Sequence, residues 1–370
     1  MALALPTIGL SAGQVGAQTV VVGYVFPQNA DLQPGQIDPS SVTRINYAFA
    51  NIKNGQMVEG FAEEGKNLAF LTALKAHNPS LTVLASVGGW LWSTDFSDVA
   101  LTRASRARFI SSVVEYLKRY DLDGLDIDWE YPGMAGNGHP FRAEDRHNFT
   151  LLLKELRKQF DSETRKTNRK MILTIAAGAS DDYVSHTELA KVQKYVNSIN
   201  LMAYVYYEPG SDLLTGHHAP LFTNHSDPKK ISADASVRAF EKAGVPPGKI
   251  VLGVPFYGHV WERVADVNHG LFQSGKPGPR TYAPFSDISA DLAGGAFQRY
   301  WDSTASAPYL YSRDKKIFIS YEDTQSLAAK CTYVLANKLG GVMFWDYAGD
   351  TSGKLLHTID KCLSLKGASQ

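Results

Sequence analysis

The chain has 370 residues, and its 37 Lys and Arg residues balance its 37 Asp and Glu residues, so the formal net charge is zero. Such a chain lacks the broad positive charge that nucleic-acid binders rely on, and we expect no nucleic-acid partner. Its 44% hydrophobic and 20% charged residues are typical of a folded globular protein and exclude disorder as the main state. No apolar run reaches the about 18 residues of a membrane span, so we expect no membrane association.

The start of the chain bears on export. Residues 1–18 are apolar and free of charged side chains, and Val15, Gly16 and Ala17 resemble a signal-peptidase site without the usual basic segment before it. We interpret segment 1–18 as a signal-peptide remnant or an artificial end, outside the fold, and expect a secreted, extracellular protein. The two cysteines, Cys331 and Cys362, fit equally a disulfide that closes a loop of about 30 residues or two free thiols.

Short β-branched and apolar runs alternate with longer amphipathic stretches along the chain. Helical periodicity places apolar side chains on one face of residues 101–119 and 143–160. Eight strand–helix units predict an α/β fold, a (β/α)₈ TIM barrel, with an open doubly wound sheet as the alternative. No glycine-rich phosphate loop follows an early strand, so nucleotide binding gains no support. The predicted strands are residues 19–24, 44–50, 81–87, 124–129, 171–176, 196–205, 249–257 and 341–345.

One gap between the predicted strands differs from the others. Residues 259–320 are rich in Gly, Pro, Ser and Tyr and contain short β-like pieces. The segment is too long for an ordinary loop between a strand and a helix. We therefore predict a small α+β insertion domain at 259–320, between strand 7 and helix 7. The barrel then consists of a first part, 19–258, and a last part, 321–370.

The strongest chemical signal is the acidic run at residues 121–132. Asp126, Asp128 and Glu130 stand at alternate positions, so on a strand all three point to one side. At the carboxyl end of a barrel strand, that side is where barrel enzymes keep their active sites. A solvated acidic loop and a metal-binding set are the alternatives. A loop does not explain the strict alternation with three apolar residues, Leu125, Ile127 and Trp129.

Three crowded carboxyl groups raise one another's pKa, because burying like charges together is unfavourable. The outermost of them, Glu130, is then expected to stay protonated and to act as a general acid. Catalytic carboxyl groups are therefore the interpretation we favour for this run.

The acidic run also resembles a known family signature. Asp123-x-x-Asp126-x-Asp128-x-Glu130 is similar to the signature of glycoside hydrolase family 18, the chitinase family. The likeness extends over residues 19–362. Further segments that resemble the family in order along the chain are 46–49, 86–90, 202–204, 216–221, 255–258, 321–327 and 340–346.

This resemblance implies hydrolysis of β-1,4-linked N-acetylglucosamine polymers with retention, in which the substrate assists its own cleavage. Glu130 would protonate the glycosidic oxygen, and the acetamido oxygen of the substrate would attack C1 to give an oxazolinium intermediate. Asp128 would accept a hydrogen bond from the acetamido N–H and stabilise the positive charge that develops there. Asp126 would share a proton with Asp128. The Tyr204 hydroxyl would orient the acetamido oxygen.

The resemblance also implies a set of substrate-binding residues. Trp345 would form the floor of the sugar site −1, and Gly88 and Gly89 would keep the space beneath the carboxyl groups open. Packing in the barrel core is the alternative for each aromatic residue. Three histidines, His217, His218 and His225, lack a second ligand cluster, so we expect no metal and no cofactor. The other expected sugar contacts are Tyr24, Phe49, Trp90, Tyr131, Met202 and Tyr257.

One residue departs from the family pattern. Val205 stands where the family usually has Asp. Glu208, three residues later in an expected loop, is the candidate to replace that carboxylate. Taking position 205 as buried, we expect Val205→Asp to raise turnover and to lower stability slightly. We expect a monomer that acts on chitin or chito-oligosaccharides. A chitin-binding lectin on the same barrel and an endo-β-N-acetylglucosaminidase are the alternative functions.

Overall fold

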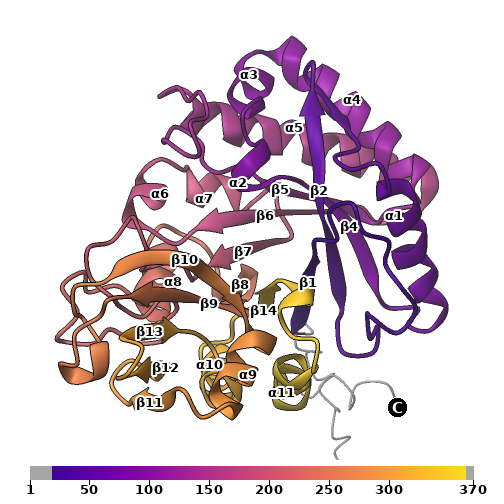
Figure 1. The fold of residues 1–370 in the computed structure, drawn as a ribbon. Helices are drawn as coiled ribbons and strands as arrows, with labels where there is room; N and C mark the ends of the chain where they lie inside the picture. The colour runs from indigo at the N-terminus through magenta and orange to yellow at the C-terminus, as the bar shows by residue number, and fades with distance from the viewer. Residues whose placement is uncertain (1–18, 364–370) are drawn as a thin grey trace, which may run out of the picture.

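Eight parallel strands close into a barrel in this computed structural model, which describes residues 19–363 (Figure 1). The first strand pairs with both the second and the last, and this closes the sheet. The predicted TIM barrel is confirmed and the open sheet is wrong. In order around the barrel the strands are β1 (Val20–Val25), β2 (Arg44–Lys53), β4 (Thr82–Gly88), β5 (Gly124–Asp128), β6 (Ile172–Gly178), β7 (Ser198–Met202), β8 (Ile250–Pro255) and β14 (Gly341–Trp345).

The helices surround this barrel, as Figure 1 shows. The stretch predicted at 101–119 begins at Arg103, because Thr102 caps it through a reciprocal bond with Ser105. The stretch predicted at 143–160 extends to Thr167. The helices are α1 (Glu64–Ala73), α2 (Gly89–Trp92), α3 (Phe96–Leu101), α4 (Arg103–Arg119), α5 (Asp145–Thr167), α6 (Asp181–Ser185), α7 (Leu189–Val192), α8 (Ala233–Lys242), α9 (Phe285–Ala293), α10 (Thr324–Ala336) and α11 (Lys354–Leu363), with 3₁₀ turns η1 (Leu74–Ala76), η2 (Pro247–Lys249), η3 (Asn268–Gly270) and η4 (Tyr347–Gly349).

The layer between strands and helices explains the alternation in β5. Leu125, Ile127 and Trp129 are buried in the main hydrophobic cluster, together with apolar residues of α4 and α5 such as Phe109 and Phe149. The residues between them therefore face the barrel interior. This burial of the outer face fixes the register of β5, since a shift by one residue would turn every apolar side chain inward.

A second sheet lies between β8 and α10 in the sequence (Figure 1). It begins at Tyr257, two residues before the segment 259–320 that was predicted as an insertion, and ends at Ser320. It has five antiparallel strands in the order β10–β9–β13–β12–β11. In the barrel sheet, a short strand, β3 (Gln56–Val58), pairs antiparallel with the end of β2 and forms a β-hairpin with it. The strands of the second sheet are β9 (Tyr257–Glu262), β10 (Lys276–Pro284), β11 (Gln298–Asp302), β12 (Ala307–Ser312) and β13 (Ile317–Ser320), and α9 follows β10.

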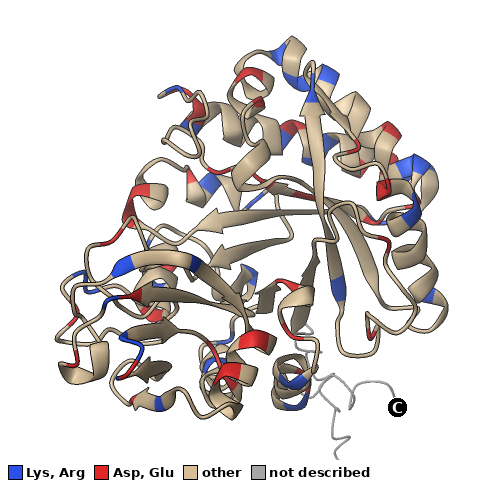
Figure 2. Cartoon of the chain, in the orientation of Figure 1, with Lys and Arg blue, Asp and Glu red and all other residues tan. Residues whose placement is uncertain are grey.

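Several sequence-based expectations concern the outside and the ends of the molecule. Segment 1–18, interpreted as a signal-peptide remnant, lies outside the described residues. Within residues 19–363, none of the helices combines the length and apolarity needed to cross a bilayer. Figure 2 shows acidic and basic residues mixed along the outer helices and loops. Cys331 and Cys362 are both free thiols, one in α10 and one in α11, so the disulfide alternative is not supported.

A buried ion pair joins the return from the second sheet to the barrel. The Lys330 ammonium lies 2.5 Å from a carboxylate oxygen of Glu322 and donates to the carbonyl oxygen of Ala219 at 2.7 Å. Both charged side chains are only 1% exposed. Burial raises the pKa of Glu322, and the charge of Lys330 opposes that rise.

We expect Lys330→Met to lower the free energy of unfolding by about 3–5 kcal/mol, because it leaves the Glu322 carboxylate buried and unpaired. Urea denaturation at pH 7 measures the loss. The loss should shrink as the pH falls toward 4, because Glu322 then takes up a proton in the folded state. The double variant Lys330→Met/Glu322→Met should recover most of the stability; a double variant as unstable as the single one would contradict this explanation.

Candidate active site

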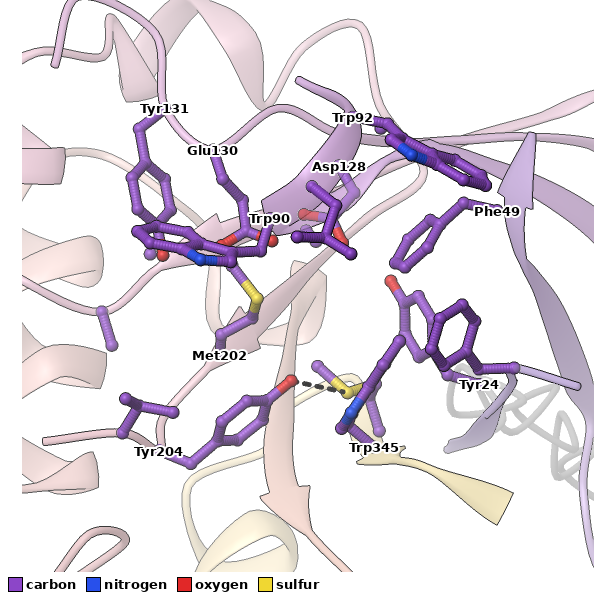
Figure 3. Close-up of a pocket in the computed structure, with 18 of the residues that line it drawn as sticks. Tyr24, Phe49, Trp90, Trp92, Asp128, Glu130, Tyr131, Met202, Tyr204 and Trp345 are labelled. Atoms are coloured by element: carbon purple, nitrogen blue, oxygen red, sulfur yellow. Dashed lines mark hydrogen bonds between the residues drawn. The ribbon is translucent and has the colours of Figure 1, made fainter. Parts of the chain in front are cut away.

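A pocket of about 730 Å³ opens at the carboxyl ends of the barrel strands (Figure 3). Its lining brings together residues that are far apart in the sequence, at or just beyond the ends of β1, β2, β4, β5, β6, β7, β8 and β14. Asp126 and Gly89 are the two predicted site residues outside the lining. The predicted residues that do line it are Tyr24, Phe49, Gly88, Trp90, Asp128, Glu130, Tyr131, Met202, Tyr204, Tyr257 and Trp345.

Asp126 lies beneath the pocket and is fully buried. One of its oxygens accepts from the Tyr24 hydroxyl at 2.7 Å and from Ser86 Oγ at 2.8 Å. The other accepts from Thr174 Oγ1 at 2.5 Å and from the Asn200 amide at 3.1 Å. Burial raises the pKa of Asp126, and these donors oppose the rise. These four hydrogen bonds hold the Asp126 carboxyl group in a fixed position beneath Asp128.

Asp128 is the next carboxyl group along β5 and is 4% exposed. Its Oδ1 is buried and has no hydrogen-bond partner among the described residues. Burial, together with the charges of Glu130 and Asp126, holds the pKa of Asp128 well above its usual range. A buried acceptor without a donor costs free energy, so this oxygen is suited to a donor that a ligand brings.

Glu130 lies just past β5, where its side chain faces the pocket (Figure 3). Burial raises the pKa of Glu130 to about 7. Its backbone N–H donates to Ser93 Oγ at 2.9 Å, and that hydroxyl donates in turn to the carbonyl oxygen of Gly89 at 2.9 Å. The turn after β4 therefore holds the backbone of Glu130. Ser93 was missed by the sequence analysis, because a serine in a turn carries no signal of such a contact.

Aromatic rings make up most of the remaining walls. The Trp345 ring stacks on Phe49 with centroids 5.5 Å apart and lies 5.7 Å from Tyr24. Trp90 stands at the rim and is 49% exposed. The nearest partner of the Tyr204 hydroxyl is the sulfur of Met343 at 4.0 Å, a weak acceptor. Lining residues that the sequence analysis missed include Phe26, Phe61, Trp92, Met134, Tyr183 and Met343.

Two glycines serve close packing where β4 ends at Gly88 and α2 begins at Gly89. Gly88 has a φ of +107°, and a Cβ there would lie 2.3 Å from the carbonyl oxygen of Asp128. A Cβ on Gly89 would lie 2.7 Å from the Phe49 ring. We predicted that both residues keep space open beneath the carboxyl groups. Gly89 instead allows Phe49 to pack closely, so for this residue the prediction is corrected.

Val205 lies at the rim with a φ of +60° and is 42% exposed. The assumption that position 205 is buried is therefore wrong, and with it the reason to expect that an Asp there lowers stability. A β-branched residue is rarely found in this left-handed region, because its Cβ substituents crowd the backbone. Glu208, the suggested substitute, lines the same pocket with an exposed carboxylate that accepts from Ser211 Oγ at 3.0 Å.

The three histidines that were considered as metal ligands each have different surroundings. His217 Nε2 lies 3.0 Å from a carboxylate oxygen of Asp302. His218 is buried with its ring 4.7 Å from that of His259, whereas His225 is exposed. Within residues 19–363, no group of three or more His, Cys, Asp or Glu residues is placed to hold a metal ion.

The chain is similar to known proteins in sequence and in fold. Residues 20–350 match the family model described as "Glycosyl hydrolases family 18". The chain belongs to that family. It is 35% identical to chitinase A1 of Niallia circulans, over 94% of this chain and 59% of that protein, and so spans little more than half of that relative. It is 30% identical to chitinase B of Serratia marcescens, over 94% of this chain and 84% of that protein.

Among solved structures, the chain is similar to a family 18 N-acetylglucosaminidase from Paenibacillus barengoltzii. The TM-score is 0.86 and the identity 42%, over 93% of this chain and all of that one. Membership of the family makes the chain a glycoside hydrolase by fold and by sequence. It confirms the resemblance inferred from the acidic run and its companion segments.

The conformation of Val205 leads to a stability prediction. We expect Val205→Asn to raise the free energy of unfolding by about 1 kcal/mol, because Asn tolerates the left-handed region that penalises a β-branched side chain. Urea denaturation measures the difference. Val205→Ile keeps the β-branch and serves as the control without a gain. An Asn variant no more stable than the wild type would show that the backbone at 205 carries no such strain.

Proposed function

We propose that the protein hydrolyses β-1,4-linked N-acetylglucosamine polymers with retention, and that the acetamido group of the substrate acts as the nucleophile. The observation that carries the proposal is the pair of Asp128 and Glu130 in an aromatic-walled pocket. One carboxyl group has an unpartnered buried oxygen, and the other has a pKa of about 7. The described lining contains no Lys, Arg or His that would neutralise them.

Glu130 fits the role of proton donor. With a pKa of about 7, a substantial share of the Glu130 carboxyl groups still carries the proton near neutral pH, where an ordinary glutamic acid has lost it. The proton passes to the glycosidic oxygen as the bond from C1 to that oxygen breaks. The resulting carboxylate then takes a proton from the water that opens the oxazolinium ring, which returns Glu130 to its acid form.

Asp128 fits the role of partner to the substrate amide. An acetamido N–H placed over Asp128 would supply the donor that its Oδ1 lacks. As the acetamido oxygen forms its bond to C1, positive charge develops on the amide, and a hydrogen bond from the amide N–H to the Asp128 oxygen stabilises it. Asp126 is a poor nucleophile for the same step, since four donors hold it beneath the pocket.

The aromatic residues fit the roles that the family resemblance implies. Trp345 offers a ring face beside Tyr24 and Phe49 for the sugar whose bond is cut. The Tyr204 hydroxyl, which has only a weak sulfur partner at 4.0 Å, is available to the acetamido oxygen. Tyr131, Met202 and Tyr257 complete the walls around these residues. Gly88 lets β4 approach the carbonyl group of Asp128.

Activity on defined oligomers tests the proposal. The wild type should cleave N-acetylchitotetraose but not cellotetraose, which has no acetamido group. Glu130→Gln should lower kcat by at least about 100-fold, the low end of general acid catalysis, while oligomer binding by calorimetry persists. Its melting temperature should not fall, because a neutral amide replaces a buried carboxyl group. Binding without cleavage by the wild type would favour a lectin, and rapid cleavage of cellotetraose would favour a protein nucleophile.

The pH dependence provides a second test. Since burial raises the pKa of Glu130, its acid form persists up to about pH 7 and is lost as the pH rises further. We expect kcat/KM on N-acetylchitotetraose to fall above pH 7, with one proton lost on the alkaline limb. An alkaline limb near pH 4.5, the range of an ordinary glutamic acid, would remove Glu130 as the acid.

A further inference from the structure

Three aromatic residues from three different connections pack together along one side of the pocket. Phe26 follows β1, Phe61 precedes α1, and Trp92 ends α2. The centroids of Phe26 and Phe61 are 5.9 Å apart, and those of Phe61 and Trp92 are 4.9 Å apart. All three rings also line the pocket. We call these three residues the aromatic wall.

The wall stands directly beside the rings that would carry the reacting sugar. The centroid of Phe26 lies 5.5 Å from that of Trp345 and 5.8 Å from that of Phe49. Figure 3 shows Trp92 next to Phe49 on the side of the pocket away from Trp90. One ring contact therefore separates the wall from Trp345.

Hydrogen bonds hold the segments that carry the wall. Asn67, buried on α1, accepts from the N–H of Leu32 at 2.8 Å and donates to the carbonyl oxygen of Ala30 at 2.9 Å. This fixes the connection after β1 to α1. Glu64, also buried on α1, accepts from the N–H of Gly60 at 2.6 Å and from the Tyr116 hydroxyl. The wall is thus tied to the barrel by buried side chains of one helix.

Close packing holds Trp92 itself. A Cβ on Gly60 would lie 2.3 Å from the Trp92 ring and 2.2 Å from the carbonyl oxygen of Phe49. The segment before α1 therefore presses against the ring without space for a larger residue. Phe61 contacts both of the other rings, so the three rings form one packed group.

The opposite side of the pocket is open. Trp90, on the side away from Trp92 in Figure 3, is 49% exposed. Two further lining residues, Val205 and Glu208, are exposed as well. Glu130 donates its proton to the bond between the sugar on Trp345 and the next sugar toward Trp90. The sugars on the wall side of that bond then belong to the non-reducing end of the chain.

We propose that the aromatic wall stops the non-reducing end of the substrate, so that the enzyme removes short products of fixed length, one or two sugars, from free non-reducing chain ends. This inference rests on the proposed function, because it takes Trp345 as the floor for the sugar whose bond is cut. It narrows the substrate class to chains that present an accessible non-reducing end.

A labelled oligomer tests the direction of cleavage. N-acetylchitohexaose with a fluorophore on its reducing end is incubated with the full chain, and the first products are separated by length. We expect a label-free mono- or disaccharide and the labelled complement, with no short labelled product at early times. Early products of many lengths, or short labelled products, would overturn the proposal.

A blocked oligomer tests the wall directly. A benzylidene acetal across the 4- and 6-hydroxyls of the non-reducing sugar makes that end too large to enter a closed pocket. We expect cleavage of blocked pentamer to be at least about tenfold slower than that of free pentamer, a difference worth about 1.4 kcal/mol. Equal rates would overturn the proposal. No cleavage of either free oligomer would instead remove the proposed function itself, and this inference with it.

Removal of the wall should change product length. In Trp92→Ala and Phe61→Ala, label-free products of three or more sugars should increase several-fold among the first products. Phe141→Ala is the matched control, since Phe141 is an exposed ring (51%) outside the pocket lining, and its product lengths should not change. If Trp92→Ala fails to fold, the product lengths of Trp92→Leu and the cleavage rate of the blocked pentamer still test the proposal. Unchanged product lengths in folded wall variants would overturn the proposal.

Discussion

The rest of the site depends on one constraint: three carboxyl groups lie close together along β5 and just beyond its end, in the barrel interior. Isolated carboxylates are costly in a barrel interior, and adjacent ones more so. The protein offsets the free-energy cost of burial differently at each of the three carboxyl groups. Burial raises the pKa of all three carboxyl groups. Four hydrogen-bond donors oppose the rise at Asp126, whereas the charges of Glu130 and Asp126 add to it at Asp128. A gradient results, from a fixed and hydrogen-bonded carboxyl group at the bottom to a proton donor at the mouth.

Neighbouring strands are shaped by the same constraint. Tyr24, Ser86, Thr174 and Asn200 lie on four strands, β1, β4, β6 and β7, and each contributes one donor to Asp126. The interior of this barrel is therefore polar at the level of Asp126, although its outer layer is apolar. The turn after β4 adds Ser93, which fixes the backbone of Glu130. The barrel thus positions the acid through its backbone and leaves the side chain free to face the pocket.

How much of this could be predicted from the sequence depends on the range of each interaction. The alternation in β5 reports burial of one face directly, so the barrel, the inward carboxyl groups and part of the pocket lining were predictable from it and from the family segments. The aromatic wall was not, because Phe26, Phe61 and Trp92 meet only through tertiary contacts between connections without periodicity. Position 205 was misjudged for a related reason: the left-handed backbone that exposes Val205 leaves no trace in the local pattern.

The composition of the pocket lining also constrains the chemistry that it can support. A Lys or Arg beside Glu130 would favour its carboxylate and lower its pKa, so the proton would be lost below neutral pH. The described lining has no such residue, and Arg44, the cation that acts on Asp126, is buried below it. Aromatic rings supply binding surface without adding charge. An aromatic pocket without cations thus does two things together: it offers faces for sugar rings, and it keeps the acid protonated where a positively charged pocket would not.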